Sequence, residues 1–185
     1  QRVFFYSWLY KDNIFSFVTP TEFVDLPSKG KFYPSEHPLH GEDTVEIRHM
    51  TAKEEDILTS RSLLKKGVAL DRVIQSLIVD KRINPDSLLV GDRNAIIIAT
   101  RISGYGPRYE TKVTCPACTA VQQYVFNLHD ASTHSANELS DLNITNNNNG
   151  TFNVELPKTK VNITFKLLKG SDEKGLKPAQ SPSRD

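Results

Sequence analysis

The chain has 185 residues, 38% of them hydrophobic, and its 23 Lys and Arg residues nearly balance 22 Asp and Glu residues, for a formal net charge of +1. This length allows one ordinary domain or two small ones. The balanced charge disfavours a protein that binds nucleic acid mainly through phosphates, and no apolar run reaches the roughly 18 residues of a membrane span. Two cysteines are too few for a disulfide scaffold, so a cytosolic or virion-type protein is expected rather than a secreted one.

Aromatic residues are concentrated at the N-terminus, where ten of the sixteen lie within the first 33 positions. We predict that residues 1–50 form an extended aromatic-rich arm followed by a Pro-rich loop. Over residues 4–10, large apolar groups fall on both faces of a strand, which therefore needs a second surface. Either part of this segment covers the helical region, or it binds a partner chain through aromatic anchors. The predicted partner-binding residues are Phe4, Phe5, Tyr6, Trp8, Tyr10, Phe15 and Phe17.

A helical core is predicted over residues 51–106. Its first helix, at about 52–66, begins at a capping box formed by Thr51 and Glu54 and ends at Gly67. The helix dipole explains the acidic residues of its first turn better than catalysis does. A second helix is capped by Asp71, and a short third one starts at the Asn84-Pro85 pair.

The last predicted helix of this core spans residues 92–103. Asp92 and Arg93 are interpreted as a helix cap and an ion pair rather than a catalytic site. Because apolar residues occupy much of its girth, we expect this helix to be the most buried one. Its predicted core face consists of Ile96, Ile98 and Ile102.

After Pro107 the pattern becomes alternating, which predicts strands in the region 107–170. Two strands flank a Cys-x-x-Cys turn, a polar loop follows at 129–150, and a second hairpin comes after it. Residues 171–185 are predicted to be a disordered tail. The fold class expected is α+β, with a small helical subdomain followed by a zinc-ribbon-like Cys-x-x-Cys β-hairpin and a second β-hairpin.

Cys115 and Cys118 are the candidate metal ligands, because a hairpin turn with this spacing aims both thiolates at one point. A structural zinc needs four ligands, and His129 and His134, or a second copy of the chain, could supply the others. A hairpin with two reduced thiols and no metal, or a redox dithiol, are the alternatives. The sequence contains no Gly-x-Ser-x-Gly, nucleotide fingerprint or convincing triad, so no enzymatic activity is expected.

Five segments together resemble a known family. They are LPSKGKFYP at 26–34, MTAKEEDILTS at 50–60, LLVGDRNAIIIATRISGYG at 88–106, TCPAC at 114–118 and FKLLKGSDE at 165–173. Over about positions 20–174, the chain is similar to the baseplate hub and hub-assembly proteins of T4-like tailed bacteriophages.

The resemblance implies a structural or assembly role in a contractile tail baseplate, in the virion, after assembly in the host cytoplasm. Other baseplate or tail proteins, and a second copy of the chain, are the expected partners. Small-molecule substrates, membranes and nucleic acid are not expected. The alternative is a zinc-ribbon nucleic-acid-binding module, for which Arg101, Arg108 and Lys112 form only a weak basic patch with Glu110 against them.

Overall fold

A computed structural model describes residues 19–131, 143–147 and 150–174. The predicted N-terminal aromatic anchors and His134 lie outside these ranges. The order of the elements is β1 (Thr21–Asp25), β2 (Thr44–Arg48), α1 (Ala52–Thr59), α2 (Arg61–Lys65), α3 (Ala69–Leu77), the 3₁₀ helix η1 (Pro85–Ser87), α4 (Val90–Tyr105), β3 (Arg108–Thr114), β4 (Val121–Asn127), the 3₁₀ helix η2 (Leu128–Asp130), β5 (Ile144–Asn146), β6 (Thr151–Glu155), β7 (Asn162–Lys166) and α5 (Gly170–Glu173). This mixture of helices and small sheets confirms the α+β class.

The body of the protein is formed by the β1–β2 hairpin, the loop that joins its strands, and the helices α1, α3 and α4. Val24 and Val45 face each other across the antiparallel hairpin, and both are buried. The loop between the strands also reaches the core. The buried cluster consists of Val24, Leu26, Tyr33, Leu39, Val45, Ile47, Val73, Ile74, Leu77, Ile78, Ile83, Leu88, Leu89 and Ile96. The core is therefore shared between residues 20–50 and the predicted helical region.

The predicted helix at 52–66 is interrupted at Ser60, so that α1 and α2 are separate helices. Ser60 has an extended backbone, with ψ at 107°. Just before it, the hydroxyl of Thr59 donates to the carbonyl of Glu55, a local hydrogen bond that competes with continued helix formation. Since α2 buries none of its residues, no tertiary packing holds the two segments in one helix.

Helix α4 is less buried than predicted, because it buries three of its sixteen residues whereas α3 buries four of nine. Its inward stripe runs through Asp92, Ile96 and Thr100 at a spacing of four residues. Ile102 is partly buried. Ile98 is 37% exposed, so its assignment to the core is wrong. Apolar residues surround most of the helix, so their pattern does not show which side faces the core. Two of the three buried residues are polar, Asp92 and Thr100.

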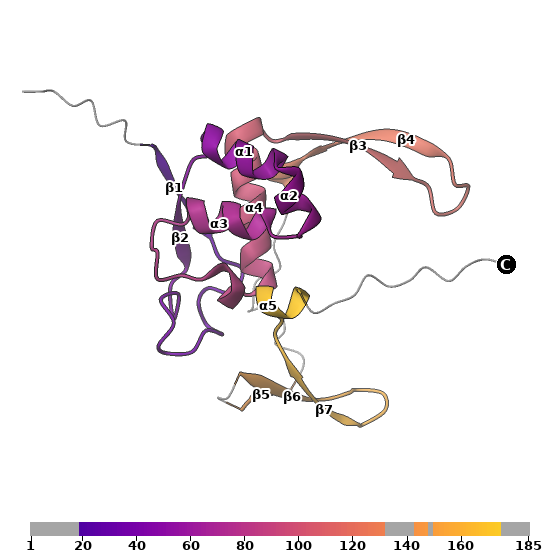
Figure 1. The fold of residues 1–185 in the computed structure, drawn as a ribbon. Coiled ribbons are helices and arrows are strands. Elements are labelled where there is room, and N and C mark those ends of the chain that lie inside the picture. The colour runs from indigo at the N-terminus through magenta and orange to yellow at the C-terminus, as the bar shows by residue number, and fades with distance from the viewer. Residues whose placement is uncertain (1–18, 132–142, 148–149, 175–185) are drawn as a thin grey trace, which may run out of the picture.

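Two β units extend from the body in different directions (Figure 1). The β3–β4 pair forms a long two-stranded ribbon beyond the C-terminal end of α4. The second predicted hairpin is present as β6–β7, and β5 adds a third strand to it. Residues 170–173, most of which were assigned to the disordered tail, form the short helix α5 instead. Among the residues described here, no helix is long and apolar enough to cross a membrane.

Substitutions on two sides of α4 test this packing. Ile96 has no exposed surface, so Ile96→Ala should lower the free energy of unfolding by about 2–5 kcal/mol through the loss of transfer energy and the cavity left behind. Ile98→Ala removes the same atoms at an exposed position and should cost less than about 1 kcal/mol. Urea unfolding followed by circular dichroism measures both, and equal losses would show that the orientation of α4 is wrong.

Candidate protein-interaction surface

The β3–β4 ribbon begins where α4 ends. Gly106 terminates the helix with a positive φ of 79°, a conformation that favours glycine. The guanidinium of Arg101 donates to the carbonyl of Gly106 over 3.0 Å, and it lies 5.0 Å from the ring centre of Tyr105 and 6.0 Å from that of Tyr109. At the base of the ribbon, the amide of Leu128 donates to the carbonyl of Pro107 over 2.8 Å. These contacts fix the direction in which the ribbon leaves the helix.

The register of the ribbon sorts its side chains onto two faces, because residues directly opposite each other share a face. Tyr109 pairs with Phe126, and Thr111 pairs with Tyr124. We call the side formed by these residues the aromatic face; its members are Tyr109, Thr111, Val113, Gln122, Tyr124 and Phe126. The opposite face is more polar and carries the ion pair between Arg108 and Glu110, at 2.7 Å.

The aromatic face is open to solvent. Tyr124 is 54% exposed and Phe126 43% exposed, and their ring centres lie 4.6 Å apart. Both edges of the ribbon lack a neighbouring strand in the described part of the chain. A two-stranded ribbon is only marginally stable by itself in water, and a contiguous exposed apolar patch usually marks an interaction site. Within the described part of the chain, the ribbon is therefore the candidate surface for contact with another protein.

The tip of the ribbon holds the two predicted metal ligands. The amide of Cys115 donates to the carbonyl of Ala120 over 2.9 Å, and the amide of Thr119 donates to the carbonyl of Cys115 over 2.9 Å. The backbone amides of Cys118 and Ala117, with a further contribution from the Cys118 side chain, lower the pKa of the Cys115 thiol. The two backbone hydrogen bonds place Cys115 and Cys118 in one turn, as the sequence predicts.

The structure does not bring His129 to the cysteines. His129 follows β4 at the base of the ribbon, and the seven residues of β4 span roughly 23 Å. Nowhere within residues 19–131, 143–147 and 150–174 do three or more His, Cys, Asp or Glu side chains form a group that could hold a metal ion. The described residues thus offer two free cysteines at the tip.

Two buried carboxylates each join separate segments of the body from which the ribbon extends. Asp92 has no exposed surface and accepts hydrogen bonds from the amide of Ser28 at 3.0 Å, the hydroxyl of Ser28 at 2.6 Å and the hydroxyl of Tyr33 at 2.7 Å. Burial, and then the charge of Asp92, raise the pKa of Tyr33. Asp92 is therefore not the partner of Arg93, and the interpretation of these neighbours as an ion pair is wrong.

Glu54, the second buried carboxylate, confirms the predicted capping box. It accepts from the amide and the hydroxyl of Thr51 at 2.9 and 2.6 Å and from the hydroxyl of Ser76 at 2.6 Å. Burial alone would raise its pKa, but the hydrogen bonds from Ser76 and Thr51 outweigh this effect and lower the pKa of Glu54 to about 2. Since Ser76 belongs to α3, the cap of α1 also joins the two helices.

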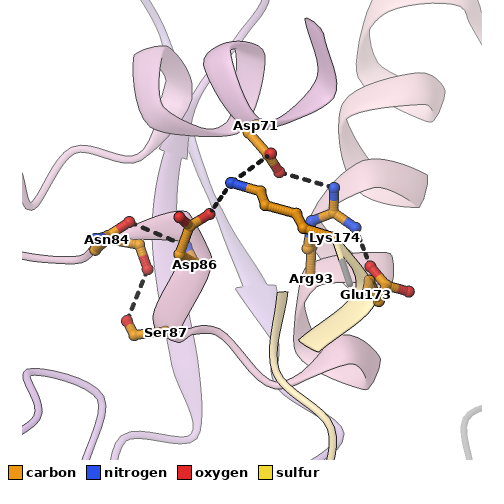
Figure 2. A network of polar contacts seen from close by, with 7 residues as sticks. All are labelled: Asp71, Asn84, Asp86, Ser87, Arg93, Glu173 and Lys174. Carbon is orange, nitrogen blue, oxygen red and sulfur yellow. Dashed lines mark hydrogen bonds and ion pairs between the residues drawn. The ribbon is translucent and has the colours of Figure 1, made fainter. Parts of the chain in front are cut away.

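A third polar cluster attaches the C-terminal segment to the body (Figure 2). Arg93 of α4 contacts Asp71 of α3 at 2.8 Å and Glu173 of α5 at 2.6 Å. Lys174 contacts Asp71 at 3.1 Å and Asp86 of η1 at 2.5 Å. The Arg93 and Asp71 side chains are each only 14% exposed, so water screens their ion pair weakly. We call these five residues the latch, because they hold α5 against three elements of the body.

A compact body that exposes an aromatic ribbon is typical of a protein that works as part of a larger assembly. A family model described as T4 bacteriophage base plate protein matches residues 19–181, and the chain belongs to this family. A search of curated proteins and a search of solved structures gave no match. The family confirms the resemblance to T4-like baseplate proteins. The chain is accordingly a structural protein of the phage tail baseplate, where it interacts with other baseplate proteins.

The lowered pKa of Glu54 makes stability depend on pH. Its value falls from the ordinary 4.5 to about 2 in the folded protein, so the stabilisation is present above about pH 4.5 and is lost as the pH falls toward 2. We expect Glu54→Gln to be less stable than the wild type at pH 7 by on the order of 3 kcal/mol. Urea unfolding at a series of pH values should show that the difference in unfolding free energy between the wild type and Glu54→Gln narrows below pH 4.5. A difference that stays constant with pH would contradict the lowered pKa of Glu54.

The latch can be tested with two cations of different exposure. Arg93→Ala removes two contacts and leaves the weakly solvated carboxylate of Asp71 with Lys174 as its remaining cation in the latch, so it should cost about 2–4 kcal/mol of unfolding free energy. Lys174 is 45% exposed, and Lys174→Ala should cost less than about 1 kcal/mol. Thermal unfolding in low salt measures both changes. A larger loss for Lys174→Ala than for Arg93→Ala would show that the buried arginine is not the centre of the latch.

Proposed function

We propose that this protein is a component of the baseplate hub, or a factor that assembles the hub, and that it acts through protein–protein contacts without enzymatic activity. It assembles in the host cytoplasm, and its function requires no small-molecule substrate, membrane or nucleic acid. The observation that carries the proposal is the exposed aromatic face of the ribbon, read together with the baseplate family. In this role, the body is a scaffold and the ribbon is a contact surface for a neighbouring subunit.

The energetics support this use of the ribbon. If each of the rings of Tyr109, Tyr124 and Phe126 loses roughly 100 Å² of exposed surface, burial at about 25 cal/mol per Å² contributes about 7.5 kcal/mol before the costs of association. Part of this is lost when two chains and their side chains become ordered. A strand of the neighbour that pairs with a free ribbon edge supplies main-chain hydrogen bonds in addition.

The N-terminal aromatic residues are a second proposed contact. Phe4, Phe5, Tyr6, Trp8, Tyr10, Phe15 and Phe17 lie outside the described residues, so their proposed role rests on composition alone. The ribbon, in contrast, has an aromatic face of known residues, and the opposite face of the same strands provides control positions. It therefore allows a sharper test.

The test compares substitutions on the two faces of β4. Tyr124→Ser with Phe126→Ser removes two rings from the aromatic face, whereas Gln123→Ser with Val125→Ser alters the opposite face. We expect the first double variant to fall at least tenfold in its ability to restore tail assembly in cells infected by a phage whose own copy is inactivated. The control variant should restore assembly nearly normally, and circular dichroism should show that both variants fold.

The composition of purified tails distinguishes a hub component from a hub-assembly factor. Mass spectrometry of purified tails should detect the wild-type chain if it is a hub component, and should detect it only in assembly intermediates if it is an assembly factor. Normal assembly by the aromatic-face variant, in a protein shown to be folded, would contradict the contact surface proposed for the ribbon.

A further inference from the structure

The turn at the ribbon tip holds two free cysteines, Cys115 and Cys118. The amide of Cys115 donates to the carbonyl of Ala120 over 2.9 Å, which closes the turn that contains Cys115 and Cys118. Thr119 then takes a positive φ of 58°, which returns the chain to β4 with its own amide bonded to the carbonyl of Cys115. Two cysteines at this spacing in a hairpin turn form one half of a tetrahedral zinc site.

Other ligands within the described residues are too far from this turn. Glu110, five residues before Cys115 on β3, lies roughly 16 Å away, and His129 lies beyond the full length of β4. Zinc in a structural site takes four ligands in a tetrahedron. Among the described residues, the tip therefore presents two of the four ligands that a zinc site needs.

We infer that two copies of this protein join tip to tip through one Zn²⁺ ion bound by Cys115 and Cys118 of each copy. A two-fold axis through the metal makes both halves identical, so each tip completes the other. Each thiol releases its proton to solvent when the metal binds, so four protons leave for each zinc bound.

The surroundings of the tip favour a second copy as the partner. Residues 113–121 contain no charged side chain, so two tips approach without repulsion. Four thiolates and one Zn²⁺ carry a net charge of −2, and Lys112 on each ribbon is the nearest charged residue and has the opposite sign. The ribbon extends well away from the helices (Figure 1), and only Pro116 and Ala117 lie between the cysteines. Two bodies therefore do not collide when the tips meet.

This inference does not depend on the proposed baseplate contact, because it uses the tip and leaves the aromatic face free. The test uses the full chain, purified under reducing conditions, stripped with a chelator and then titrated with Zn²⁺. We expect about half an equivalent of tightly held zinc per chain and a twofold rise in mass by light scattering, reversed by the chelator. Titration with Co²⁺ should give the absorption of a tetrahedral four-thiolate site.

Two variants complete the experiment. Cys115→Ser with Cys118→Ser should lose the metal and the added mass, whereas Thr114→Ser, next to the pair, should keep both. Less than about a tenth of an equivalent of zinc, one zinc per monomer, or a mass that does not respond to zinc would each overturn the inference. Zinc that persists in the double serine variant would overturn it as well. None of these outcomes changes the result expected for the aromatic-face variants in tail assembly.

Discussion

The carboxylate of Asp92 is the contact on which the arrangement of the body depends. A buried charge is tolerated only when enough donors surround it, and here Ser28 and Tyr33 supply three hydrogen bonds to the two oxygens. Tyr33 also accepts a hydrogen bond from the amide of Leu89, at 3.1 Å. The loop at 26–34 is thereby tied to the start of α4. A hydrophobic contact could join these segments, but it would not fix their register in the same way.

The backbone of this loop is adapted to the same contact. Gly30 has a φ of +66°, and a Cβ atom there would overlap the backbone of Leu39 and Glu42. Its amide donates to the hydroxyl of Ser28 over 3.1 Å, and that hydroxyl in turn donates to Asp92. The Pro- and Gly-rich segment is therefore an ordered part of the core, although its composition alone is typical of a surface loop.

Local signals in the sequence were sufficient for features that depend on neighbouring residues. The capping box at Thr51 and Glu54, the helix start at the Asn84-Pro85 pair and the alternating strands around Cys115 all follow from short-range patterns. Contacts between distant segments were not predictable in this way. Nothing near Asp92 indicates that its partners lie some sixty residues earlier, and nothing near Glu173 indicates that α5 binds Arg93. Ile98 was misassigned because an apolar helix shows its inward side only when its neighbours are known.

Helix α4 connects two parts of the molecule that expose apolar surface. Its sixteen residues span about 24 Å, with the Asp92 contact at one end and the ribbon at the other. The β5–β6–β7 sheet is attached near the N-terminal end, where the amide of Val90 donates to the carbonyl of Leu168, and Leu168 is about half exposed. The exposed apolar surfaces are thus held apart by a helix anchored at a buried charge. A neighbour bound at either end contacts a surface whose position the body has already fixed, so less ordering is required on binding.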